Sequence, residues 1–168
     1  TPDLITSAKG LTNGSVPMGA VLCREGIYST LADATHKDGI EFPHGYTYSG
    51  HGLACAAAIA TLDTYEEDGL FERSLAIEAY FEERLHGLRG LPYVKDLRNF
   101  GMIGAVELES REGAFGTRGF ELYQRCFESG VLIRVTGETV ALSPPLIIET
   151  EQIDTIFDTI AAHLTSLN

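Results

Sequence analysis

From Tyr93 onward, the hydrophobic pattern switches repeatedly between the period of strands and the period of helices. The predicted elements are one broken strand or two strands within 93–108, a helix at 120–127, strands at 131–135 and 139–142, and a last helix capped by Thr150. This order restricts the half of the chain after Tyr93 to an α+β unit, with a mostly antiparallel sheet and helices on one side.

The first part of the chain has a different pattern. A turn followed by a short strand is predicted at 2–8 and a second strand at 16–23, before a long polar loop at 33–50. Residues 53–65 are small and apolar, which predicts a helix buried on all sides. An amphipathic surface helix is predicted from Phe71 onward, so we place a domain boundary near 66–75.

Composition narrows the possible partners. The chain has 168 residues and a net charge of −12, without a basic cluster, so nucleic acid is not an expected partner. No apolar run reaches the roughly 18 residues that span a membrane. Three widely spaced cysteines fit no zinc or disulfide pattern and favour a reducing, cytoplasmic location. The start without Met suggests a fragment or a partly observed protein.

Lys9 is the first candidate for chemistry. It ends a short apolar run and precedes Gly10, whereas Lys37 and Lys95 have polar neighbours. A lysine at the end of a strand can direct its amine into a cleft and condense with an aldehyde, if burial or a cation favours the neutral amine. The apolar run offers partial burial, but a solvated lysine at a strand end also fits the pattern. The S-x-x-K motif of serine acylases fits less well, because Thr6 replaces the serine and the companion motifs are absent.

The loop His44-Gly45-Tyr46-Thr47-Tyr48-Ser49-Gly50-His51 is the second candidate. Its hydroxyl groups and backbone amides stand directly before a predicted helix, an arrangement that suits a phosphate. A tyrosine-rich loop that packs on its own domain is the alternative. The seven-residue spacing of His44 and His51 matches no common metal-ligand pattern, so no metal is expected.

Arg134 is the third candidate. It is a charged residue within the apolar stretch 131–135, where it must be paired or face a cleft. The planar guanidinium suits a carboxylate ligand. The pattern equally allows a structural ion pair with Glu138 across the predicted turn.

These features occur in order within motifs that resemble those of class III aminotransferases. The motifs are Pro2-Asp3-Leu4-Ile5-Thr6-Ser7-Ala8-Lys9-Gly10-Leu11-Thr12-Asn13-Gly14 with Pro17-Met18-Gly19-Ala20-Val21, then Gly45-Tyr46-Thr47-Tyr48-Ser49-Gly50-His51, and Gly130-Val131-Leu132-Ile133-Arg134-Val135-Thr136-Gly137 with Leu142-Ser143-Pro144-Pro145-Leu146. The last motif resembles the ω-amino acid–pyruvate (β-alanine–pyruvate) branch. The resemblance implies an α/β fold, fold-type I of the pyridoxal-phosphate-dependent transferases. Residues 1–70 would end the large cofactor domain, and 71–168 would form the C-terminal small domain.

The resemblance also implies roles for the three candidates. Lys9 would form the internal aldimine with pyridoxal 5′-phosphate and move the proton between the substrate and the cofactor. Thr47 would bind the cofactor phosphate of the neighbouring subunit, and Arg134 would hold a substrate carboxylate. The expected activity moves an amino group from an ω-amino acid or amine to pyruvate, in a homodimer or homotetramer.

Two alternatives stay open. Another donor, such as taurine, putrescine or an aromatic amine, would keep the same chemistry. The isolated 168 residues are expected to be catalytically silent, because the family places the aspartate for the pyridine nitrogen, the stacking aromatic residue and the main phosphate loop upstream of the matched segment.

Overall fold

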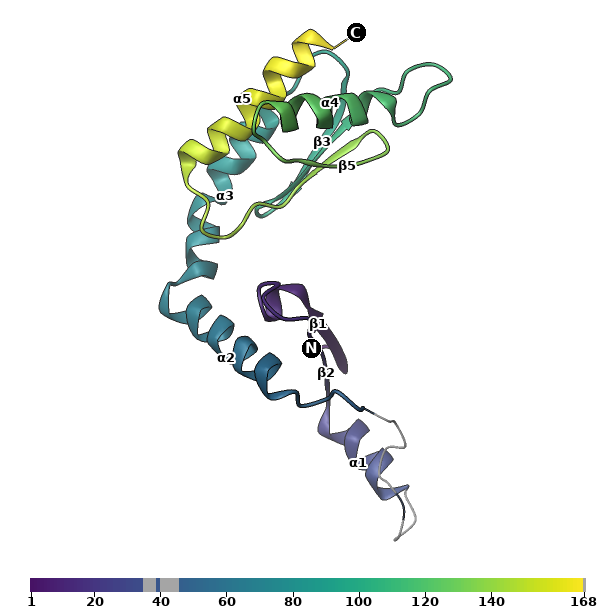
Figure 1. Cartoon of the computed structure of the whole chain (residues 1–168), viewed down its shortest axis with the longest axis vertical. Helices are drawn as coiled ribbons and strands as arrows, with labels where there is room; N and C mark the ends of the chain where they lie inside the picture. The colour runs from purple at the N-terminus through teal and green to yellow at the C-terminus, as the bar shows by residue number, and fades with distance from the viewer. Residues whose placement is uncertain (35–38, 40–45, 168) are drawn as a thin grey trace. The chain divides into compact units, whose positions relative to one another are not determined.

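The computed structural model describes residues 1–34, 39 and 46–167, which divide into two compact units, Thr1–Asp68 and Gly69–Asn168. The first unit contains β1 (Leu4–Ala8), the 3-10 turn η1 (Lys9–Leu11), β2 (Gly19–Cys23), α1 (Glu25–Asp33) and α2 (Gly52–Glu67) (Figure 1). The second contains α3 (Leu70–His86), β3 (Val94–Phe100), β4 (Ile103–Leu108), α4 (Thr117–Glu128), β5 (Arg134–Thr136), β6 (Thr139–Leu142) and α5 (Thr150–Ser166). None of the helices in the described part of the chain combines the length and the apolar composition of a membrane span.

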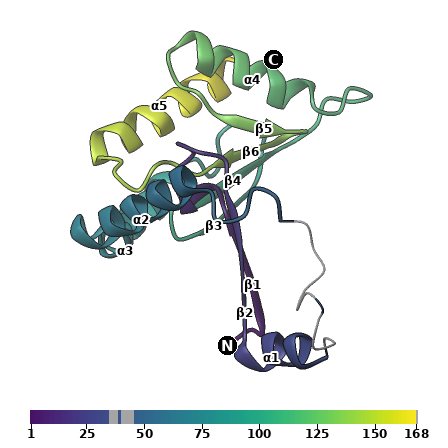
Figure 2. The same cartoon turned by 60° about the horizontal axis from the view of Figure 1, so that its bottom comes forward.

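The first unit is built on an antiparallel hairpin of β1 and β2, which is seen edge-on in Figure 2. Its register runs from Leu4 opposite Cys23 to Ala8 opposite Gly19. Apolar side chains on both strands are exposed, including Ile5. The hairpin therefore has no buried face of its own within the described part of the unit.

Helix α2 forms where the sequence is rich in alanine, the residue with the highest helix propensity. The expectation that this helix is buried on all sides is wrong within the unit, because Ala54 and Ala58 are its only buried residues. Leu53 and Ile59 are 65% and 60% exposed. A two-stranded sheet is too small to cover every face of a sixteen-residue helix.

The second unit contains a four-stranded antiparallel sheet in the order β3-β4-β6-β5. Alternate residues such as Val106 and Val140 are fully buried beneath the helices. Helix α5 packs against both α3 and α4, and Phe81 meets Phe157 edge to face with a centroid distance of 5.3 Å. The buried core of this unit is Phe81, Leu85, Leu88, Leu97, Met102, Val106, Leu108, Leu122, Cys126, Val131, Ile133, Val140, Leu142, Ile148, Ile153, Phe157, Ile160, Leu164 and Leu167.

The predicted order of strands and helices in the second unit is confirmed, with two local differences. The stretch predicted as a strand at 131–135 pairs only from Arg134, because the Val131 amide donates to the Cys126 carbonyl at the end of α4 (2.8 Å). Thr150 is the first helical residue of α5 rather than its cap. Glu149 is the N-cap, and it forms a reciprocal capping box with Gln152.

Candidate active site

Lys9 stands where β1 ends, as the first residue of η1. Its backbone has a left-handed φ of 53°, which is uncommon for a residue with a side chain. The Lys9 carbonyl accepts hydrogen bonds from the amides of Thr12 (3.2 Å) and Gly14 (3.3 Å), and this holds the turn closed. The side chain of Lys9 is exposed, so the expectation of partial burial by the preceding apolar run is wrong within this unit.

Two contacts fix the turn that carries Lys9. The hydroxyl of Thr12, which is only 2% exposed, donates to the Val16 carbonyl at 2.6 Å. The Tyr65 hydroxyl on α2 donates to the Gly10 carbonyl at 2.7 Å. Sequence reasoning missed Tyr65, because 55 residues separate the partners and no local pattern marks the contact.

Thr47 lies in a turn before α2 and lines a pocket of the first unit. The residues that line this pocket come from the start of β2 and its preceding loop and from the turn and first residues of α2: Val16, Pro17, Met18, Gly19, Tyr46, Thr47, Tyr48, Ser49, Gly50, His51, Ala54 and Cys55. Lys9 is not among them. The structure therefore places Lys9 and Thr47 in one unit, but does not bring both side chains into this pocket.

Residues at the beginning of α2 also line the Thr47 pocket. His51 is the N-cap, and its Nδ1 atom accepts from the Ala54 amide at 3.3 Å. The amides of Gly52 and Leu53 have no partner among the described residues. The hydroxyl-bearing residues Thr47 and Ser49 line the pocket directly before this helix N-terminus, an environment that suits a phosphate. His44 and Gly45 lie outside the described residues.

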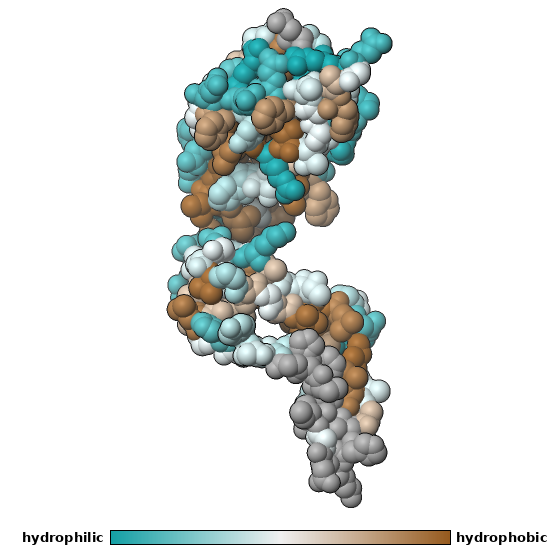
Figure 3. Space-filling model, turned by 45° about the vertical axis from the view of Figure 1, so that its right-hand side comes forward, coloured by the Kyte–Doolittle hydropathy of each residue, from teal (hydrophilic) through white to brown (hydrophobic). Residues whose placement is uncertain are grey.

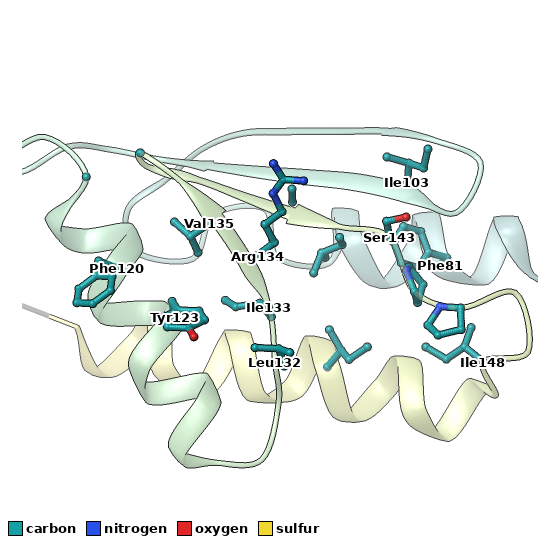
Figure 4. Close-up of a pocket in the computed structure, with 17 residues that line it drawn as sticks. Phe81, Ile103, Phe120, Tyr123, Leu132, Ile133, Arg134, Val135, Ser143 and Ile148 are labelled. Atoms are coloured by element: carbon teal, nitrogen blue, oxygen red, sulfur yellow. The ribbon is translucent and has the colours of Figure 1, made fainter. Parts of the chain in front are cut away.

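Arg134 begins β5, the edge strand of the sheet in the second unit. Its neighbour Val135 packs against the core, so Arg134 points to the opposite face of the strand (Figure 4). The guanidinium is exposed and has no hydrogen-bond or ion-pair partner among the described residues. The ion pair with Glu138 does not form, because the Glu138 carboxylate accepts from the amides of Gly116 and Gly119 instead.

Arg134 has a second arginine, Arg98, in the same cross-strand row of the sheet. Ala105 and Ala141 lie between the two arginines in this row. Arg98 donates to Asp96 (2.6 Å) and to Glu107 (3.1 Å). Hydrogen bonds from Lys95 and then Arg98 lower the pKa of Glu107. Arg98 is therefore engaged within the protein, whereas the small alanine neighbours leave Arg134 free to meet a ligand.

A groove of about 980 Å³ runs along β5 in the second unit and contains Arg134 as its charged residue. Phe120 and Tyr123 of α4 form one wall, and Ser143 lies beyond Arg134 on the side of Ile103 (Figure 4). Figure 3 shows patches of apolar residues, in brown, among the hydrophilic residues on the surface of this unit. A single cation in a largely apolar groove can recognise a small ligand that carries one carboxylate.

Among residues 1–34, 39 and 46–167, no group of three or more His, Cys, Asp and Glu side chains is arranged to hold a metal ion. The three free cysteines, Cys23, Cys55 and Cys126, are not bonded to one another.

Comparison with known proteins identifies the family. Residues 1–164 match the family "Aminotransferase class-III". The chain is 51% identical over 160 residues to an omega-aminotransferase of Caulobacter vibrioides, and 40% identical over 168 residues to a beta-alanine–pyruvate aminotransferase of Pseudomonas aeruginosa. These matches cover 95% and 99% of the chain but only 36% and 38% of the relatives, so the chain spans little more than a third of their length.

Solved structures agree with this result. A transaminase with L-ala superimposes with a TM-score of 0.92 at 32% identity, covering 99% of the chain and 40% of that structure. An (S)-enantioselective omega-transaminase from Thermomicrobium roseum gives 0.88 at 34% identity, covering 99% and 38%. The chain thus has the fold of the fold-type I transaminases, and it belongs to the class III aminotransferases. This family depends on pyridoxal phosphate.

Proposed function

We propose that the intact protein is a pyridoxal-phosphate-dependent aminotransferase that moves an amino group from a β-alanine-like ω-amino acid to pyruvate, giving L-alanine and an oxo acid. The observation that carries the proposal is the position of Lys9, an exposed amine on a fixed turn at the end of β1 in a chain of this family. The chain covers only part of its relatives, so other segments are needed to complete the site.

The residues of the chain fit the cofactor at two points. The Lys9 amine has the chemistry to bond covalently to the cofactor aldehyde, and the donors around Thr47 suit its phosphate. When bound, pyridoxal phosphate acts as an electron sink that stabilises negative charge on the substrate carbon. The Nζ atom of Lys9 would take the proton from that carbon and deliver it to the cofactor, so that Lys9 moves the proton between the substrate and the cofactor.

Thr47 is proposed to serve the site of a neighbouring subunit. The turn of Lys9 is anchored to Tyr65 in the last part of α2, whereas Thr47 precedes its first residue. Tyr65 is fourteen positions after His51, which corresponds to about 21 Å of helix. Anchoring at opposite ends of α2 supports a site assembled from two subunits, in a homodimer or homotetramer.

Arg134 is proposed to bind the carboxylate of the ω-amino acid and of pyruvate. Its unpaired guanidinium in an otherwise apolar groove supports a donor with a carboxylate. A putrescine–pyruvate aminotransferase of Pseudomonas aeruginosa is 39% identical over 160 residues, covering 91% of the chain and 34% of that relative. Putrescine has no carboxylate, so its use as the preferred donor would leave Arg134 to bind pyruvate alone.

The domain assignment is also a proposal. We assign residues 1–70 to the end of the large cofactor domain and 71–168 to the small domain. The separate core of the unit Gly69–Asn168 supports this division. The exposed apolar residues of β1, β2 and α2 support a larger cofactor domain that covers them. Three free cysteines are consistent with a cytoplasmic location.

The direct test is Lys9→Ala in the intact protein supplied with pyridoxal phosphate. The protein is expected to show a visible absorption band from covalently held cofactor, and Lys9→Ala is expected to lose both this band and transamination. Lys95→Ala is the matched control, because Lys95 is exposed and pairs with Glu107 (2.7 Å). A Lys9→Ala protein that keeps the band and the activity would contradict the proposal.

A further inference from the structure

Glu138 is a carboxylate buried in the turn between β5 and β6, with only 4% of its surface exposed. Its Oε1 atom accepts from the Gly116 amide at 2.7 Å, and its Oε2 atom accepts from the Gly119 amide at 2.6 Å. Gly116 is the N-cap of α4 and has no side chain to cap the helix. Glu138 therefore caps α4 from the β5–β6 turn, as an aspartate at the N-cap position would cap its own helix. The helix dipole favours the negative charge of Glu138 at this end of α4.

The turn that contains Glu138 is held on several sides. Thr136 pairs with Thr139, and Gly137 between them has a φ of +59°, as the first central position of a type II′ hairpin turn requires. The ring of Phe115 covers Gly137 so closely that a Cβ there would lie 2.5 Å from it. The Glu138 carbonyl also accepts from the Leu108 amide at 2.9 Å, which ties the turn to β4.

Arg134 depends on this hairpin for its position. Strand β5 has three residues and lies at the sheet edge, so β6 is its only strand neighbour in the described part of the chain. The guanidinium has no partner of its own among the described residues. Its place is therefore set by three register pairs with β6 and by the packing of Val135 against the start of α4.

We propose that Glu138 is a positioning residue for Arg134. By holding the β5–β6 turn against the beginning of α4, the Glu138 carboxylate fixes the strand from which Arg134 reaches into the groove. It thereby sets how strongly the site prefers substrates that carry a carboxylate. This inference rests on the proposed function, in which Arg134 binds that carboxylate.

The experiment compares β-alanine with propylamine, which has the same chain length but a methyl group in place of the carboxylate. For the intact, cofactor-loaded protein with pyruvate as acceptor, the preference is the ratio of the two kcat/KM values. Arg134→Ala should lower this ratio by at least about tenfold, the cost of one charge-assisted hydrogen bond. Glu138→Gln should lower it by about three- to tenfold through the KM for β-alanine, because an amide keeps only one acceptor.

Three further variants complete the design. Glu112→Gln is the control, since Glu112 is exposed in the loop before α4 and should leave the ratio unchanged. Glu138→Asp keeps the charge with a shorter reach and should give an intermediate ratio, which preserves the test if Glu138→Gln does not fold. In an Arg134→Ala background, Glu138→Gln should change the ratio no further. Binding of propionate, measured by calorimetry, should weaken in parallel in the single variants.

The outcomes distinguish the carboxylate-binding role of Arg134 from the positioning role of Glu138. If Arg134→Ala lowers the ratio but Glu138→Gln reduces both donors equally, Glu138 is only a structural residue and the inference is overturned. If Arg134→Ala itself leaves the ratio unchanged, the carboxylate role of Arg134 is wrong, and the inference is overturned with it. A ratio lowered by Glu138→Gln only while Arg134 is present supports the inference.

Discussion

Tyr65 donates a hydrogen bond of 2.7 Å to the carbonyl oxygen of Gly10, the residue that follows Lys9. This contact joins the last part of α2 to the turn that carries the amine. Lys9 itself has a left-handed backbone conformation, which is strained for a residue with a side chain and needs support from its surroundings. A residue far away in sequence thus helps to hold the Lys9 turn in its conformation.

Removing the Tyr65 hydroxyl should loosen this turn. We expect Tyr65→Phe to lower the free energy of unfolding by about 0.5–1.5 kcal/mol, the net value of one hydrogen bond. Hydrogen exchange at the amides of Thr12 and Gly14, which close the turn, should become faster. Tyr28→Phe is the control, because Tyr28 is 54% exposed on α1. Equal exchange in both variants would show that the Tyr65 contact does not hold the turn.

The Thr47 hydroxyl should contribute to cofactor binding. Thr47→Val keeps the shape of the side chain but removes a donor to the phosphate, so we expect the Kd for pyridoxal phosphate to rise by about 10- to 100-fold. Equilibrium dialysis of the intact protein measures this change. Thr64→Val is the matched control, because the Thr64 hydroxyl bonds to the Ala60 carbonyl within α2. A Thr47→Val protein with unchanged affinity would remove Thr47 from the proposed site.

Gly119 is required by close packing rather than by its backbone angle. A Cβ at this position would lie 2.4 Å from the Gly137 carbonyl oxygen and 2.8 Å from Cγ1 of Val135. We therefore expect Gly119→Ala to destabilise the protein by about 1–3 kcal/mol. The matched control is Gly26→Ala in α1, where the space around a Cβ is open and the change should stabilise the helix by about 0.5–1 kcal/mol. Denaturant unfolding of both variants tests the difference in sign.

The sequence predicts much of the second unit because local signals mark its elements. Helix α5 has its predicted apolar face, with Ile153, Phe157 and Leu164 buried. The hairpin around Gly101 follows from a glycine between two apolar runs, and Gly101 has a φ of 56°. These features depend on residues close together in the chain, which is why periodicity and turn signals identify them.

Contacts between distant segments are less predictable. Glu138 is near Arg134 in sequence and has the opposite charge, so an ion pair is a natural expectation. The carboxylate instead caps α4, because Gly116 leaves that helix start without a side-chain acceptor and the turn lies against it. The exposure of α2 likewise cannot be predicted from its composition, because burial depends on which other segments cover the helix.

Cys126 should make the stability of the protein fall at alkaline pH. It is fully buried on α4, and desolvation raises the pKa of its thiol to about 11. The unfolded chain loses this proton at lower pH, so the unfolded state binds fewer protons between the two pKa values and is favoured as pH rises. The contribution of the protonated Cys126 thiol to the free energy of unfolding is fully present below the pKa of the thiol in the unfolded chain. This contribution is lost as the pH rises to the pKa of the thiol in the folded protein.

The comparison of the protein with Cys126→Ala isolates this effect from other titrating groups. Between about pH 8 and about pH 11, the free energy of unfolding should fall by about 2 kcal/mol more in the unchanged protein than in Cys126→Ala. The constant cost of the cavity in the variant cancels from this difference. Urea unfolding under reducing conditions at several pH values provides the measurement. Parallel pH profiles for the two proteins would mean that the folded thiol ionises as readily as the unfolded one.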